Sequence, residues 1–138
     1  MSTEYKKPVP GIDELSRPYW EAAKRHELVM QRCRECGCYR YPPGNICPGC
    51  ASEDTEWVKV SGRGTIFTWN VFHKVYHPAF AQDVPYAIVA VELEEGPRVT
   101  SNLVDCRLED IRIGMPVEVV FEDITEEISL PKFRPVSR

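Results

Sequence analysis

From residue 57 onward, short apolar runs alternate with turn residues, and this pattern predicts a β-rich unit. Five strands rich in β-branched and aromatic residues are expected at residues 57–60, 64–73, 86–93, 98–104 and 117–123. Residues 128–133 are a candidate for one more edge strand. In the link before the last long strand, Asp105 can cap and Gly114 can close a single helical turn. Short strands with such a link fit a five-stranded OB-fold barrel.

The segment before the barrel has a different period. Residues 16–28 place a capping Ser16 and then Pro18 at a helix start, and Tyr19 and Ala22 follow at helical spacing. We expect one amphipathic helix there, followed by a cysteine-rich segment. The predicted units are an N-terminal helical segment (1–28), a metal-binding ribbon (29–55) and the OB-fold domain (56–138), so the fold class is mainly β.

Length and composition limit the kind of protein. A chain of 138 residues fits one main domain with a small appendage. The first residues lack an apolar secretion signal, and the longest apolar run, residues 86–91, is too short to cross a bilayer. We therefore expect a soluble cytoplasmic protein that does not bind membranes. The formal charge of −4 argues against a surface built to neutralise phosphates.

Two Cys-x-x-Cys pairs predict a metal site. Cys33 and Cys36 form the first pair, Cys47 and Cys50 the second, and ten residues separate the pairs. Four thiolates close a tetrahedral zinc site and leave no position for substrate, so one zinc ion here would be structural. Redox dithiols are the weaker interpretation, and iron in a rubredoxin-like centre stays open because the same ligands hold it. Cys38 is interpreted as a spare thiol.

Other reactive side chains form no recognised motif. His73 and His77 flank an aromatic loop at residues 74–85, and Cys106 follows a strand. A Cys–His nucleophile pair is one interpretation, but structural histidines and a small buried cysteine are the more common outcome. The loop is long for a hairpin, which makes it the first candidate contact surface.

Charge and aromatic residues leave two further alternatives open. Acidic residues concentrate at 92–95 and 118–127, whereas the N-terminal third is basic through Arg17, Lys24, Arg25, Arg32, Arg34 and Arg40. These basic residues form either a solvated face or a phosphate site. Aromatic side chains on one predicted strand and its loop either fill the core or stack bases, namely Phe67, Trp69, Phe72 and Tyr76.

Taken together, the motifs resemble a known family. The likeness covers PYWEAAKRHELVMQRC, CRECGCYRYPPGNICPGC, GRGTIFTWNVFHKVYHPAFAQDVPYAIVAVELEEGPRV, IGMPVEVVFEDI and LPKFRP, nearly the whole chain. These segments resemble the zinc-ribbon and OB-fold family associated with acyl-CoA enzymes, once catalogued only as a domain of unknown function. The resemblance implies zinc ligands at Cys33, Cys36, Cys47 and Cys50.

The resemblance also implies a role. Members of the family resemble accessory subunits that pair with thiolase-like enzymes, hydratases or synthases and help to form the acyl-CoA site. The implied function is a subunit that is inactive alone and shares a CoA thioester with its partner in a hetero-oligomer. Our candidate contacts to ligand or partner are Arg32, Arg34, Arg40, His73, His77, Phe80 and Tyr86. The alternatives are a single-stranded nucleic-acid binder, disfavoured by the acidic charge, and an independent enzyme using His73, His77 or Cys106.

Overall fold

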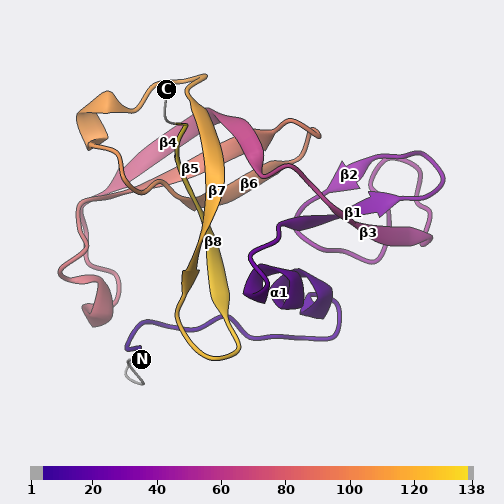
Figure 1. Cartoon of the computed structure of the whole chain (residues 1–138), viewed down its shortest axis with the longest axis horizontal. Helices are drawn as coiled ribbons and strands as arrows, with labels where there is room; N and C mark the ends of the chain where they lie inside the picture. Colours follow the sequence, from indigo (N-terminus) through magenta and orange to yellow (C-terminus); the bar gives the residue numbers. More distant parts are fainter. Residues whose placement is uncertain (1–4, 137–138) are drawn as a thin grey trace.

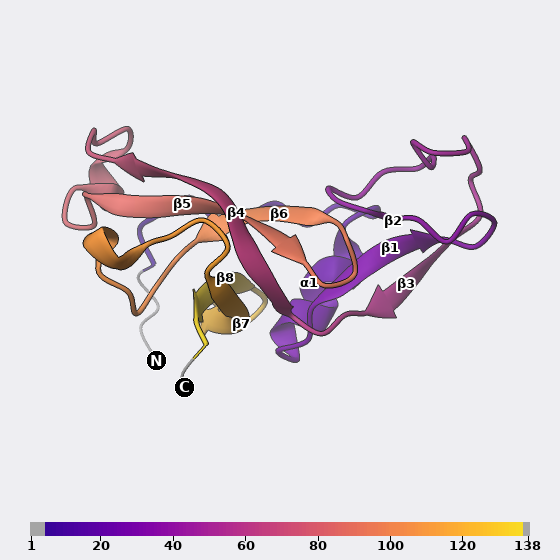
Figure 2. The ribbon, with the colours of Figure 1, turned by 90° about the horizontal axis from the view of Figure 1, so that it is seen from above.

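The computed structural model describes residues 5–136 and divides them into a small ribbon end and a barrel end (Figure 1). The elements are α1 (Arg17–Lys24), β1 (Val29–Cys33), β2 (Tyr39–Arg40), β3 (Thr55–Lys59), β4 (Arg63–Phe72), η1 (Pro78–Phe80), β5 (Tyr86–Leu93), β6 (Arg98–Asn102), η2 (Leu108–Asp110), β7 (Pro116–Asp123) and β8 (Ser129–Pro135). Figure 2 shows β1, β2 and β3 at one end of the molecule and the barrel at the other. The mainly β fold class is confirmed.

Helix α1 begins where the sequence predicts and ends earlier. Ser16 occupies the N-cap position, and its backbone N–H donates to Asp13 Oδ1 at 2.7 Å. The helix stops because His26 adopts a left-handed conformation, with φ of 62°, and the N–H of Glu27 donates to the carbonyl of Ala22 at 2.9 Å. This is a Schellman ending. Glycine is the usual residue in this left-handed position, so nothing in the sequence indicated that the helix ends before His26. The predicted helix, which ran to residue 28, was therefore too long.

The ribbon end carries a three-stranded sheet in the order β2-β1-β3. Strand β3 pairs with β1 from Val29↔Lys59 to Cys33↔Thr55. The strand predicted at residues 57–60 therefore exists, but its assignment to the barrel was wrong. Side-chain alternation identifies a strand and not its partner, because pairing depends on distant residues.

The barrel is a five-stranded sheet in the order β6-β5-β4-β7-β8. Strand β8 pairs with β7 from Val117↔Pro135 to Asp123↔Ser129, so the candidate edge strand at 128–133 is a full barrel strand. An isolated parallel bridge between Leu103 and Phe133 nearly closes the sheet, as in an OB-fold. The helical turn predicted between residues 105 and 114 is present as η2.

One hydrophobic core joins both ends of the molecule. Phe133 and Val89 are fully buried at its centre in the barrel. Tyr19 of α1, Leu28 and Met30 belong to the same cluster, with 7%, 2% and 1% of their surfaces exposed. The start of β1 is therefore anchored in the barrel core, whereas the segment that carries the cysteines lies beyond it.

Polar contacts also fasten α1 to the barrel. The ring of His26 stacks on Phe121 with centroids 5.2 Å apart, and its Nε2 lies 2.8 Å from Asp123 Oδ1. Lys24 Nζ donates to the carbonyl of Thr125 at 3.2 Å. Of residues 5–136, none belongs to a helix with the length and apolarity that crossing a bilayer requires.

Candidate functional site

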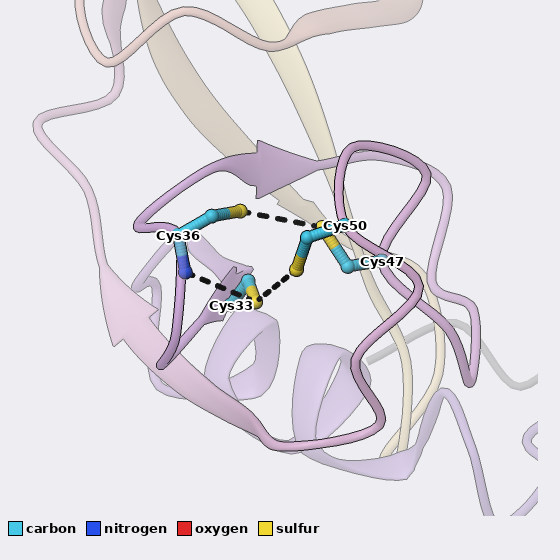
Figure 3. Close-up of side chains that lie close together, drawn as sticks. All are labelled: Cys33, Cys36, Cys47 and Cys50. Carbon is cyan, nitrogen blue, oxygen red and sulfur yellow. Dashed lines mark hydrogen bonds between the residues drawn. The ribbon is translucent and has the colours of Figure 1, made fainter.

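Four cysteines meet at the tip of the ribbon (Figure 3). Cys33 ends β1, Cys36 follows in the first turn, and Cys47 and Cys50 lie in the second turn before β3. Their four Sγ atoms all lie within 4.8 Å of one another. Cys33 and Cys47 are buried, while Cys36 and Cys50 face outward. The two pairs singled out by their spacing are therefore brought together in space.

The geometry of these thiols fits a tetrahedral metal. The Sγ atoms of Cys33 and Cys50 are 3.6 Å apart, and those of Cys36 and Cys47 are 3.5 Å apart. Four sulfurs at a Zn–S distance of about 2.3 Å would lie about 3.8 Å from one another. Backbone N–H groups support thiolate charge, since that of Cys36 donates to Cys33 Sγ at 3.5 Å and that of Gly49 to Cys47 Sγ at 3.3 Å. The donor set suits one structural zinc ion with no open coordination position.

The thiols also compete for negative charge. The N–H of Cys36 is the main cause that lowers the pKa of Cys33 to about 6. The N–H of Ser52 acts in the same direction on Cys50, but the neighbouring thiols and burial outweigh it and raise the pKa of Cys50 to about 12. Four thiolates this close repel one another unless a cation is present. A divalent metal at their centre removes that conflict.

The two remaining cysteines lie outside the cluster. Cys38 is exposed, and its carbonyl accepts a hydrogen bond from the N–H of Cys33 at 2.8 Å. Cys106 lies on the barrel, where its thiol donates to the carbonyl of Arg107 at 3.3 Å. Burial raises the pKa of Cys106, which disfavours a reactive thiolate.

The three candidate arginines occupy different environments on the ribbon. Arg32 and Arg34 are exposed. Both lie 3.8 Å from Glu56, and Arg34 lies 3.8 Å from Asp54. Arg32 Nε also donates to the carbonyl of Gly37 at 3.4 Å. Arg40 is 7% exposed, and its Nη2 donates to the carbonyl of Gly44 at 2.9 Å and to Thr55 Oγ1 at 2.6 Å. Arg40 thus holds the loop of the ribbon in place, and it offers no exposed group to a ligand.

The predicted aromatic loop forms a cluster at the far end of the barrel. The ring of Tyr86 lies between those of Phe72 and Phe80, with centroid distances of 5.6 Å to Phe72 and 6.0 Å to Phe80. Tyr76 packs on Phe72 at 5.8 Å and remains 71% exposed. His77 Nδ1 accepts from the N–H of Ala79 at 3.0 Å, which caps η1. His73, also a candidate, is exposed beside the cluster.

The other aromatic side chains on β4 have separate roles. Trp69 is half-buried and packs against the core. Phe67 is 45% exposed, and the guanidinium of Arg98 lies 3.7 Å above its ring centroid. The face of Phe67 that a base would stack on is therefore already covered.

A cavity of about 630 Å³ lies beside the aromatic cluster. Two of the candidate residues, Phe80 and Tyr86, form part of its wall. Sequence reasoning missed the rest of this wall, which includes Tyr5 and Lys7 before α1 and Lys132 on β8. No local signal marks these residues, because the wall is assembled from segments more than a hundred residues apart.

Comparisons with known proteins match both ends of the chain. Residues 20–56 match the family model of the ChsH2 rubredoxin-like zinc ribbon domain, and residues 57–122 match that of the ChsH2 C-terminal OB-fold domain. A DUF35 domain-containing scaffold protein of Methanocaldococcus jannaschii is 41% identical over 117 residues, covering 83% of this chain and 82% of that protein.

Two further comparisons involve proteins that are named as enzymes or enzyme subunits. A probable enoyl-CoA hydratase alpha subunit of Thermomonospora curvata is 42% identical over 129 residues, covering 94% of this chain but only 40% of that protein. A solved structure of the Ltp2-ChsH2(DUF35) aldolase contains a chain that superposes with a TM-score of 0.82 at 42% identity, covering 92% of this chain and 98% of that one. The chain therefore belongs to the DUF35 family of proteins that combine a rubredoxin-like zinc ribbon with an OB-fold barrel.

Proposed function

We propose that this chain is a non-catalytic subunit that binds an acyl-CoA enzyme, of the thiolase superfamily or a hydratase, and helps to form its acyl-CoA site. The observation that carries the proposal is the likeness to a chain in the solved structure of the Ltp2-ChsH2(DUF35) aldolase. The match covers 92% of this chain and 98% of that chain. Close similarity along a whole domain makes a similar assembly role the simplest expectation.

The side chains considered for catalysis support a non-catalytic role. Nδ1 of His77 is engaged in capping η1, and the Cys106 thiol is held by a backbone carbonyl with a raised pKa. Among the hydrogen bonds of residues 5–136, none joins Cys106 to a histidine. An activated nucleophile requires a base within hydrogen-bond reach. In this proposal the reaction belongs to the partner enzyme.

The partner surface is assigned to the end of the barrel opposite the ribbon. The loop between β4 and β5 and the loop that contains η2 both project there (Figures 1 and 2). The first of these loops exposes two adjacent apolar side chains, since Val75 is 42% and Tyr76 is 71% exposed. Clustered apolar side chains that remain in water are typical of protein contact sites.

Arg32 and Arg34 are assigned to anionic groups at the ribbon end. Both guanidinium groups are accessible, and their carboxylate neighbours lie at 3.8 Å, beyond hydrogen-bond distance. Exposed arginines with spare donors suit the phosphates of CoA or an acidic patch on the partner. Arg40 is left out of the proposed contacts because it is buried.

The proposal is tested by affinity capture of the tagged chain from its native cells, with mass spectrometry and a metal assay on the same sample. We expect an acyl-CoA enzyme in fixed ratio and about one zinc per chain. The double variant Val75→Ser, Tyr76→Ser should capture less enzyme, whereas Ile46→Ser, which alters another exposed apolar residue on the ribbon, should not. Capture of nucleic acid without any acyl-CoA enzyme would contradict the proposal and favour the nucleic-acid alternative.

The arginine assignment has its own test on the captured complex. Arg32→Ala with Arg34→Ala should weaken the binding of CoA, or of the enzyme, by at least several-fold. Arg17→Ala with Arg25→Ala removes the same charge from exposed positions at α1 and serves as the control. Unchanged affinities for both CoA and enzyme would remove the ribbon arginines from the proposed contacts.

A further inference from the structure

Arg40 is a buried cation without a carboxylate partner. Among the ion pairs of residues 5–136, none includes Arg40. Its Nη2 donates to Gly44 and Thr55, whereas Nε and Nη1 are buried and have no hydrogen-bond partner. Burial of an unpaired guanidinium is costly, because the charge loses its hydration. A compensating negative charge is therefore expected close to this side chain.

Strand pairing places Arg40 on the same face of the ribbon sheet as the first cysteine of the cluster. Arg40 of β2 lies opposite Gln31 of β1, and Thr55 of β3 lies opposite Cys33 of β1. Directly opposite residues project to the same face of a sheet, and so do residues two apart along one strand. Gln31, Cys33, Arg40 and Thr55 therefore share one face, and the first three are buried there.

The guanidinium crosses this face toward the thiol cluster. From β2 at one edge of the sheet, its Nη2 reaches Thr55 Oγ1 on β3 at the other edge, at 2.6 Å. The Cβ atoms of directly opposite residues lie about 4.5–5.5 Å apart, so Thr55 is an immediate neighbour of Cys33. Cys33 Sγ is one of the four sulfurs that lie within 4.8 Å of one another (Figure 3). The buried cation thus ends beside the residue that faces the cluster.

The thiol cluster needs positive charge when it holds zinc. Four thiolates outweigh the two charges of one zinc ion, so the loaded site has an excess of two negative charges. Cys33 and Cys47 are buried, so part of this excess lies away from water. Opposite charges interact much more strongly in a buried region than across water. The neighbouring Arg32 and Arg34 are exposed, so solvent screens their charge.

We propose that Arg40 is a positioning residue of the metal centre, whose buried charge offsets the excess negative charge of the four thiolates and raises the affinity of the ribbon for zinc. The role differs from that of a loop anchor. The hydrogen bonds to Gly44 and Thr55 hold the loop, whereas the charge acts through space on the cluster. The proposal goes beyond the proposed function and does not depend on it, because the chain alone contains every group involved.

The first test is the zinc affinity of the full chain, measured by competition with a strong chelator at fixed pH and ionic strength. Arg40→Met keeps an apolar stem without the charge and should weaken zinc binding at least tenfold. Arg40→Lys restores a positive charge without the planar fork of donors, so its affinity should lie within about threefold of the wild type. Lys59→Met removes an exposed charge from the same sheet and is the control, with an expected change below about twofold.

A hydrogen-bond variant separates charge from anchoring. Thr55→Val removes one acceptor of Arg40 and leaves the guanidinium bound to the carbonyl of Gly44. Because the charge stays, this variant should lose at most about threefold in zinc affinity, which is the usual size of one neutral hydrogen bond or less. If anchoring were the whole role of Arg40, Thr55→Val and Arg40→Lys would both lose as much affinity as Arg40→Met.

Iron supplies a second readout, which reports charge and not the strength of folding. The same four thiolates accept iron, and a nearby cation favours its more negative reduced state. In the iron-loaded chain, Arg40→Met should lower the midpoint potential by about 59 mV, a tenfold change in the one-electron equilibrium constant. Arg40→Lys and Lys59→Met should each change that constant by less than about twofold.

Each outcome decides the proposal. Equal zinc affinity in Arg40→Met and the wild type, equal losses in Arg40→Lys and Arg40→Met, or an iron potential unchanged in Arg40→Met would overturn it. If Arg40→Met holds no metal, Arg40→Lys decides: affinity close to the wild type supports the counter-charge, and loss of the metal overturns it. The proposed function is judged separately by affinity capture, and neither result alters the other.

Discussion

Removal of the metal should unfold the ribbon arm and leave the barrel intact. In residues 34–54, only Arg40 and Cys47 are buried, so this arm has no apolar core of its own. Structural zinc contributes an apparent binding free energy of about 10–16 kcal/mol in small zinc-finger peptides. Without the ion, the free energy of opening the arm should fall to roughly zero, the value for segments held by few buried contacts.

The start of β1 should behave differently from the arm. Leu28 and Met30 are 2% and 1% exposed in the core shared with the barrel. Burial of each side chain contributes about 1.5–3 kcal/mol, so the pair retains about 3–6 kcal/mol that does not depend on metal. Because about 1.4 kcal/mol corresponds to a factor of ten, amide exchange there should remain roughly 10²–10⁴-fold slower than in an open chain.

Hydrogen exchange with mass spectrometry, before and after complete chelation at pH 7, measures both segments together. Cys50→Ser should reproduce the effect of chelation, because it removes a ligand. Cys38→Ser changes an exposed thiol outside the cluster and should leave exchange unchanged. Protection that persists across residues 34–54 in a sample shown to lack metal would refute the reasoning. Fast exchange at residues 28–30 would refute the shared core.

Three further changes test the barrel. Phe133→Ala should lower the free energy of unfolding by about 3–5 kcal/mol in urea denaturation, because the side chain is fully buried. Gly64→Ala should lower the free energy of unfolding by about 1–3 kcal/mol, because the added Cβ would lie 2.3 Å from a carbonyl oxygen of β5. The control Gly11→Ala has no atom within 4 Å of its added Cβ and should lower it far less. Equal losses in the two variants would contradict this reasoning. Hydrogen bonds to the Ser129 hydroxyl and, to a smaller extent, to the His26 imidazole lower the pKa of Asp123. The ionised carboxylate of Asp123 therefore stabilises the fold. This contribution is present above the unfolded pKa of about 3.9 and is lost as pH falls through the lower pKa of the folded state. Asp123→Asn should therefore flatten the fall of the urea midpoint between about pH 5 and 2.

Local patterns predicted much of this fold because the responsible physics is local. Two Cys-x-x-Cys turns placed four thiols at one site, since each turn delivers two ligands from adjacent backbone. Alternating apolar residues located the strands of the barrel, including the one between residues 117 and 123. The helix start at Ser16 followed from its cap position and the proline in the first turn.

The errors arose where distant residues decide. The pattern at residues 57–60 identified a strand, but its pairing with β1 depends on a partner 28 residues earlier at Met30↔Val58. Arg40 looked like one of several surface arginines, yet packing around Gly44 and Thr55 buries it. Burial is a property of the assembled structure, and a charged residue type alone does not reveal it.

The sequence by itself determined the four cysteines that meet at the ribbon tip, the mainly β class and the likeness to one family, because spacing and short-range periodicity depend on neighbouring residues. Tertiary structure alone decided the shared core that joins β1 to the barrel, the burial of Arg40, and the cavity between the segment before α1 and β8. Each of these features brings together segments far apart in the chain. Their contacts are set by the packing of the whole molecule, which favours one arrangement through burial of apolar surface.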